Sequence, residues 1–203
     1  TQGPVMLQWL NLLEGFSLTS LGHNSVEYLH TLAECAKLAF ADREQYYADP
    51  DFVNVPLDRL LSKEYADERR KLVDLCCASM ELRPGGVSPI KLKDYGDVVR
   101  PEADTVHLEA VDADGNMLSA TPSGAWIRTS PVVPGLGFPM GTRAQMLHLD
   151  PNQAERLEPG KRPSTTLTPS LLTKDGEPYM TFGTPGGDQQ DQWTIQFLLN
   201  HID

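Results

Sequence analysis

The chain has 203 residues, of which 40% are hydrophobic and 22% are charged, as in a soluble globular protein. Seventeen basic residues against 28 acidic ones give a formal net charge of −11, which repels a phosphate backbone, so no nucleic-acid partner is expected. No apolar run approaches the roughly 18 to 20 residues of a membrane helix, so no membrane association is expected, and nothing indicates a compartment.

Helical patterns fill the first part of the chain. Residues 5–14 are predicted to form a short helix. A longer helix is predicted to begin at Asn24 as N-cap, because Glu27 follows three residues later and apolar residues then recur at helical spacing. Ser62 is the predicted N-cap of a further helix. The segment from residue 1 to about residue 78 is therefore predicted to be helical.

The next segment, residues 81–103, has three prolines and three glycines, which predicts an exposed and poorly ordered connector. After it the apolar period changes from helical spacing to alternation. Two hairpins are predicted around the turns "DADGN" and "KDGE", and a helix is predicted over residues 191–202. Two strand pairs followed by a helix favour a layered α+β fold, with αββα as one arrangement.

The residue types that usually hold metals or form disulfides are not arranged for either purpose. Cys35, Cys76 and Cys77 fit neither a disulfide framework nor metal-ligand spacing, and are expected to be reduced structural thiols. The five histidines also lack metal-ligand spacing, and His107 is expected to be a hydrogen-bonded strand residue. No metal site is therefore predicted.

Two stretches suggest chemistry. "PGKRPSTTLTPSLL" (159–172) carries five hydroxyl residues behind Lys-Arg-Pro, and "TFGTPGGDQQDQW" (181–193) ends a predicted strand in a Pro-Gly-Gly turn that opens a helix. That turn is either only a turn or an oxyanion hole, because adjacent glycines can present backbone N–H groups unobstructed by side chains. A threonine after a flexible connector, such as Thr105 after Asp104, gains its own base if the preceding bond is cut.

Three stretches resemble the γ-glutamyltransferases of the N-terminal-nucleophile (Ntn) hydrolase class. They are the helical "LLEGFSLTSLGHNSVEYLH…ADPDFV", "DTVHLEAVDADGNMLSAT" and "PGKRPSTTLTPSLLTKDGEPYMTFGTPGG". The resemblance runs along essentially the whole chain but covers only part of the family's length. It implies an Ntn-type αββα sandwich made in part by this chain. Residues 1–104, including the connector 81–104, would end the large subunit, and residues 105–203 would begin the small subunit of the same precursor.

The resemblance also implies roles for individual residues. Thr105 matches the nucleophile, and Asp104-Thr105 matches the bond that the precursor cleaves by itself. Gly186 and Gly187 match the glycine pair of the oxyanion hole. Ser123 matches a threonine whose hydroxyl supports the nucleophile.

The remaining matched positions concern the substrate. Thr165 and Thr166 match a pair of serines that hold the substrate's α-carboxylate. Ala125 stands where typical members have Asn, and "GFPMGTRAQMLHL" stands where they have a motif whose acid pairs with the substrate's α-ammonium group. Arg143, of opposite charge, lies in that region and is a candidate substrate-binding residue. Loss of a desolvated charged partner changes specificity, so the chemistry is predicted more firmly than the glutathione substrate.

The sequence therefore predicts a self-processing amidohydrolase and acyltransferase that needs no cofactor. Its partners would be a small amide, γ-glutamyl or similar, and water or an amine as acyl acceptor. One alternative is an acylase of the same superfamily that removes a glutaryl-type group, which has no α-ammonium. The other alternative is a catalytically inactive fragment whose hydroxyls only decorate a sheet.

Overall fold

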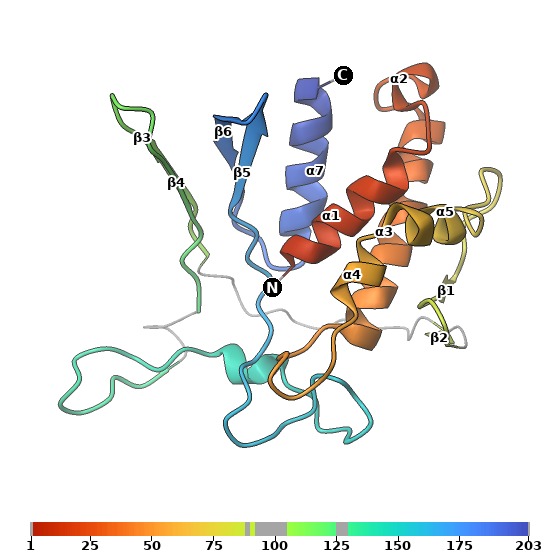
Figure 1. Cartoon of the computed structure of the whole chain (residues 1–203). Coiled ribbons are helices and arrows are strands. Elements are labelled where there is room, and N and C mark those ends of the chain that lie inside the picture. The colour runs from red at the N-terminus through yellow and green to blue at the C-terminus, as the bar shows by residue number, and fades with distance from the viewer. Residues whose placement is uncertain (1, 88–89, 92–104, 125–129, 203) are drawn as a thin grey trace. The chain divides into compact units, whose positions relative to one another are not determined.

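The computed structural model describes residues 2–87, 90–91, 105–124 and 130–202, and it has an α+β fold (Figure 1). The chain divides into two compact units. A strand-containing unit comprises residues 1–3, 99–148 and 163–202, and a helical unit comprises residues 4–98 and 149–162. Each short segment, 1–3 and 149–162, thus belongs to the unit built mainly by the other end of the chain. Among the described helices, none has the length and apolar character that a membrane span requires.

The helical unit follows the predicted pattern as far as Arg70, but residues 71–78, which were also predicted to be helical, form turns and bends. Its helices are α1 (Gly3–Leu13), α2 (Leu18–Leu21), α3 (Val26–Tyr46), α4 (Leu57–Leu60) and α5 (Lys63–Arg70). Ser62 caps α5 as predicted, because its side chain accepts a hydrogen bond from the Tyr65 N–H at 3.1 Å.

The cap predicted for α3 is wrong by one residue. Ser25, with an extended backbone, accepts a hydrogen bond from the Tyr28 N–H at 3.0 Å. Asn24 has a φ of 56°, a left-handed conformation that Asn tolerates and that is unlike the extended geometry of an N-cap. Asn24 therefore makes the turn before the helix, and Ser25 caps it.

A buried carboxylate, Asp42, joins three parts of the helical unit. It accepts hydrogen bonds from Gln8 on α1, from the Tyr65 hydroxyl at 3.0 Å and from the Gly85 N–H at 2.7 Å, and Arg69 lies 3.4 Å away. Burial raises the pKa of Asp42, although these partners oppose the shift. Such a network needs every member in place, so it fixes residue 85 against α3 and α5.

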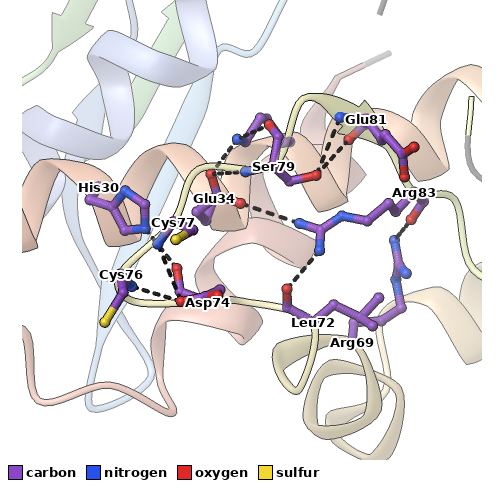
Figure 2. A network of polar contacts seen from close by, with 11 residues as sticks. His30, Glu34, Arg69, Leu72, Asp74, Cys76, Cys77, Ser79, Glu81 and Arg83 are labelled. Atoms are coloured by element: carbon purple, nitrogen blue, oxygen red, sulfur yellow. Dashed lines mark hydrogen bonds and ion pairs between the residues drawn. The ribbon is translucent and has the colours of Figure 1, made fainter. Parts of the chain in front are cut away.

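A second buried carboxylate, Glu34 on α3, holds the segment that follows α5 (Figure 2). Its side chain is 1% exposed and accepts hydrogen bonds from Arg83 Nη2 and from the Ser79 N–H, each at 3.2 Å. Lys37 is its third partner. Figure 2 also shows Arg83 reaching the carbonyl of Leu72, at 2.6 Å.

These contacts correct the prediction for the connector. The short strands β1 (Glu81–Leu82) and β2 (Ile90–Lys91) pair antiparallel, and Gly85 is buried. The Pro- and Gly-rich residues 81–87 therefore form a packed turn. Arg83 and Gly85 in this turn donate hydrogen bonds to the buried acids Glu34 and Asp42 of α3. Residues 92–104 of the predicted connector lie outside the described part of the chain.

The strand-containing unit confirms the two predicted hairpins and the last helix. β3 (Leu108–Val111) pairs with β4 (Met117–Ala120), and β5 (Ser170–Lys174) pairs with β6 (Glu177–Phe182). β4 lies beside β6, and the Ser119 hydroxyl oxygen is 3.5 Å from the Phe182 carbonyl oxygen. Helix α7 (Gln189–Ile202) packs its Phe197 ring 6.3 Å from that of Phe182 on β6.

Candidate active site

Thr105 lies at the open end of the β3–β4 hairpin. The turn at residues 112–116 is closed by Asp112, which accepts hydrogen bonds from the Asp114 and Asn116 N–H groups at 2.9 Å. This turn sets a register in which Leu108 faces Ala120. The register continues past the strands, because the Val106 N–H donates to the Pro122 carbonyl at 3.1 Å.

That register places Thr105 opposite Ser123. Their hydroxyl oxygens, Thr105 Oγ1 and Ser123 Oγ, are 2.7 Å apart, a hydrogen-bond distance. Both side chains are half-buried. The two residues that the sequence assigned to the nucleophile and its support therefore touch.

The same face of the hairpin carries two more polar pairs, as the two-residue period of strands requires. His107 Nδ1 lies 2.7 Å from Thr121 Oγ1, and the Ser119 hydroxyl donates to Glu109 at 3.1 Å. His107 Nε2 contacts Glu109. His107 lies directly before β3 and is hydrogen-bonded through both ring nitrogens, which confirms its predicted hydrogen bonding but places it outside the strand.

Glu109 and His107 also tie the hairpin to the neighbouring β6 segment. Burial alone would raise the pKa of Glu109, but hydrogen bonds from Thr181, His107 and Ser119 hold it below its ordinary value. A Cβ on Gly183 would collide with the His107 ring, so the imidazole lies directly against that backbone. The segment that begins at Thr105 is thereby packed beside the end of β6.

The glycine pair forms the turn between β6 and α7. Gly186 has a φ of 132° and Gly187 a φ of 55°, both in the region that favours glycine. Their carbonyls accept the N–H groups of Gln189 and Gln190, which begins the helix. Within the described residues, no hydrogen bond uses the N–H of Gly186 or Gly187.

Thr165 and Thr166 form the hydroxyl pair that was predicted to bind the substrate's carboxylate. Thr166 is buried and Thr165 is half-buried. The Gln190 side chain donates a hydrogen bond to Thr166 Oγ1 at 3.4 Å. Gln190 lies in the first turn of α7, three residues after Gly187. This contact connects the hydroxyl pair to the helix that follows the glycine turn.

Arg143 is positioned through Gly124, the residue after Ser123. It opens the short 3-10 helix η1 (Arg143–Met146), and the preceding Thr142 donates both its N–H, at 3.3 Å, and its hydroxyl, at 2.7 Å, to the Gly124 carbonyl. Arg143 Nη2 is buried and finds no hydrogen-bond partner among the residues described. Burial lowers the pKa of this guanidinium.

All described residues of the predicted site belong to the strand-containing unit: Thr105, Ser123, Arg143, Thr165, Thr166, Gly186 and Gly187. The contacts above join Thr105 to Ser123, and Thr166 to the start of α7. Asp104 and Ala125 lie outside the described residues. Sequence reasoning missed Thr142 and Gln190, because nothing local marks them as partners of Gly124 and Thr166.

No candidate metal site accompanies these residues in the described ranges, where no three His, Cys, Asp or Glu side chains gather around a common point. The described residues of the predicted site offer hydroxyls, backbone N–H groups and the Arg143 guanidinium. Hydroxyls suit nucleophilic attack, and N–H groups and guanidinium suit negatively charged oxygens.

Comparison with known proteins matches the chain to a known family. The whole chain, residues 1–203, matches the family described as gamma-glutamyltranspeptidase. It is 34% identical over 204 residues to the glutathione hydrolase-like YwrD proenzyme of Bacillus subtilis, covering 100% of this chain and 36% of that protein. It is 36% identical over 208 residues to the acylase ACY 1 proenzyme of a Pseudomonas species, covering 100% of this chain and 34% of that protein.

Among solved structures, the cephalosporin acylase from Bacillus halodurans superposes with a TM-score of 0.77 at 36% identity. The match covers 100% of this chain and 34% of the acylase chain. The chain thus spans about a third of the length of these relatives. At this identity the likeness supports the predicted α+β fold of Ntn hydrolases.

Proposed function

The chain belongs to the gamma-glutamyltranspeptidase family, which it matches over all 203 residues, and we propose that the enzyme it forms part of is a self-processing amidohydrolase and acyltransferase. Its substrate is a γ-glutamyl or similar amide, and the acyl group passes to water or to an amine. The precursor yields a large subunit that ends at Asp104 and a small subunit that begins at Thr105.

One observation carries this proposal: the 2.7 Å contact between Thr105 Oγ1 and Ser123 Oγ. The hairpin register fixes it, and it holds the hydroxyl of the residue that follows the proposed cleavage point. A hydroxyl that a neighbour orients loses less freedom when it attacks a carbonyl. An inert scaffold does not require such an arrangement at the open end of a hairpin.

Self-cleavage uses the hydroxyl of Thr105 and the carbonyl of Asp104. The oxygen attacks the carbonyl carbon, the C–N bond breaks, and the hydroxyl proton moves to the departing nitrogen, so an ester replaces the amide. Water then hydrolyses the ester, which frees the Asp104 carboxylate, the Thr105 hydroxyl and the new α-amino group. That amine is the base that the intact chain lacks.

Turnover repeats the same chemistry on an external amide. The α-amino group of Thr105 takes the hydroxyl proton while the oxygen attacks the substrate carbonyl, and the proton passes to the leaving amine. The resulting acyl ester is cleaved by water or by an acceptor amine. The N–H groups of Gly186 and Gly187 stabilise the oxyanion in both steps, and each such donor is worth about 3 to 4 kcal/mol of barrier.

The test is the intact mass of the full-length protein after incubation at neutral pH. We expect two masses that meet at the Asp104-Thr105 bond, one mass for Thr105→Ala, and partial cleavage for Thr105→Ser, which keeps a hydroxyl. Amide hydrolysis should follow the same order. A Thr105→Ala protein that still hydrolyses the substrate would overturn the assignment.

A second substrate class, glutaryl-type amides, is favoured by the environment of Arg143. A buried guanidinium nitrogen that lacks a protein acceptor in the described chain calls for an anionic oxygen from a ligand. A glutaryl group ends in a carboxylate and carries no ammonium that Arg143 would repel. This acyl group therefore suits the charge of the site.

Comparing turnover of glutaryl and γ-glutamyl anilides tests this second class. We expect higher kcat/KM on the glutaryl anilide, and a roughly 10- to 100-fold loss on it for Arg143→Gln, as for a hydrogen bond to a charged group. Arg156→Gln is the matched control, because Arg156 pairs with Glu158 in the helical unit. Equal rates on both anilides, with no effect of Arg143→Gln, would contradict the assignment to Arg143.

A further inference from the structure

Residues 149–162 come from the second half of the chain but pack within the helical unit, which residues 4–98 otherwise build. If the Asp104-Thr105 bond is cut, this segment belongs to one product and its packing partners belong to the other. Its contacts in the helical unit are then contacts between two polypeptides.

The main contact is a set of three hydrogen bonds that Arg162 donates to Asp49. Asp49 Oδ2 accepts from the Arg162 backbone N–H at 2.8 Å and from Nε at 3.1 Å, and Oδ1 accepts from Nη2 at 2.6 Å. The Asp49 side chain is 1% exposed. A buried carboxylate needs such a partner, since its charge is otherwise uncompensated.

The same guanidinium makes a second, different contact. Arg162 Nη2 lies 2.7 Å from Asp51 Oδ2, but the Asp51 side chain is 74% exposed. Exposed ion pairs contribute little because water screens them. The two acids therefore form a natural pair of test and control.

The neighbouring residues of the segment add packing. Lys161 is buried, and its ammonium group donates a hydrogen bond to the Ala154 carbonyl. The same ammonium nitrogen lies 5.7 Å from the centroid of the Phe52 ring. Gly160 lies near the same ring, because a Cβ built on it would be 4.0 Å from Phe52 Cζ. The loop at residues 49–52 is thus met by three consecutive residues, 160–162.

A reciprocal contact exists in the strand-containing unit. Gln2, from the other product, is 1% exposed, and its side chain donates to Asp188 Oδ1 at 2.6 Å. Residues 1–3 belong to that unit. Each product thus lends a short segment to the unit that the other product builds.

Within this chain, the net charges on the two sides of the Asp104-Thr105 bond oppose association. Residues 1–104 contain 11 basic and 17 acidic residues, and residues 105–203 contain 6 basic and 11 acidic ones. Both of these stretches are acidic, so their average fields repel. A local cation facing a buried acid reverses that repulsion at one place.

We infer that residues 149–162 form a docking arm by which the small-subunit product holds the large-subunit product after cleavage, with Arg162 and Asp49 as its clamp. The inference rests on the proposed self-cleavage, which turns an internal segment into an intermolecular one. The Lys-Arg of the "PGKRP" stretch then serves subunit association, next to the hydroxyl pair that serves the substrate.

The experiment measures how firmly the two products of the full-length protein stay together. Fully processed protein is sedimented at increasing urea concentrations, and separation of the products is followed by their masses. We expect Arg162→Gln and Asp49→Asn to weaken association about tenfold or more. Asp51→Asn should leave it within about twofold, because its pair is exposed.

Unchanged association in both clamp variants would overturn the inference. Arg162→Lys adds a graded test, since it keeps the charge but loses the forked geometry, and it should lie between wild type and Arg162→Gln. Association equal to that of Arg162→Gln would assign the effect to the fork alone and still support the clamp. Association equal to that of wild type would show that a bare charge suffices.

Failure of the docking arm can be separated from failure of self-cleavage. A Thr105→Ala protein with a protease-recognition sequence inserted within residues 92–104 is cut from outside, and its products are compared with and without Arg162→Gln. An uncut wild-type mass would contradict the proposed function, while the externally cut protein still tests the arm. The uncut Thr105→Ala, Arg162→Gln chain reports by its circular dichroism whether the variant folds.

Discussion

Ser123 shows how one side chain supports the proposed nucleophile. Its hydroxyl lies 2.7 Å from that of Thr105 and orients it. Ser123→Ala removes one hydrogen bond, worth about 0.5 to 1.5 kcal/mol net, so we expect kcat to fall roughly 2- to 12-fold and self-cleavage to slow. Steady-state kinetics and a time course of intact masses check both.

Ser123→Thr is the matched control, because it retains the hydroxyl. It should process and turn over near the wild-type rate, whereas a purely structural role would make both variants lose thermal stability in step with activity. Equal kcat for Ser123→Ala and wild type would remove Ser123 from the site.

Asp49 gives a pH dependence at the same scale. Hydrogen bonds from the Arg162 side chain and backbone hold the pKa of Asp49 well below its ordinary range, and Asp51 is the other acid that contacts Arg162. A depressed folded-state pKa stabilises at pH values above the unfolded pKa of about 3.9, and this contribution is lost as the pH falls below it.

We therefore expect the processed wild-type protein to resist urea fully at pH 6 and to lose resistance between about pH 4 and pH 2. Asp49→Asn should be weaker at pH 6 and should lack this part of the pH dependence. If the difference in urea resistance between wild type and Asp49→Asn stayed constant from pH 6 to pH 3, the lowered pKa of Asp49 would be contradicted. Sedimentation in urea at each pH measures it.

At the scale of elements, the β6–α7 turn contains two glycines that differ in how well they would tolerate a side chain. A Cβ on Gly186 would lie 2.5 Å from the Trp193 ring, and its φ of 132° suits only glycine. Gly187, with a φ of 55°, has nothing within 4 Å of a Cβ. Gly186→Ala should therefore compromise folding, while Gly187→Ala should fold at a cost of about 1 to 2 kcal/mol.

The folded Gly187→Ala protein tests the oxyanion role. We expect kcat to fall by up to roughly 100-fold with KM little changed, because interference with an oxyanion donor affects the transition state more than the ground state. Gly176→Ala is the control, since Gly176 also has a positive φ and open space but lies in the β5–β6 turn. A kcat loss no larger than that of the control would assign the turn a structural role alone.

At the scale of the whole molecule, processing should change the order of the unfolding reaction. One chain becomes two that exchange short segments, so unfolding of the cleaved protein releases two molecules. Its stability should fall by about 1.4 kcal/mol for each tenfold dilution. The uncut Thr105→Ala protein should show a urea midpoint independent of concentration, and a cleaved protein that behaves in the same way would contradict this expectation.

The sequence by itself determined the local structure and the family. Apolar spacing and caps predicted the helices, Asp-Gly turns predicted both hairpins, and motif residues indicated the family, because all of these depend on residues close together in the chain. The sequence placed the N-cap of α3 at Asn24 instead of Ser25, because Asn and Ser are both good caps. Only the left-handed backbone conformation of Asn24 distinguishes the two.

Only the tertiary structure decided what depends on residues far apart in the sequence. A Pro- and Gly-rich segment forms a packed turn because it supplies hydrogen-bond donors to Glu34 and Asp42. Buried carboxylates require such donors, which can come from a distant part of the chain. Arg162 likewise found Asp49, 113 positions away. Composition and periodicity carry no record of such pairings, since they are selected by burial and geometry after the elements have formed.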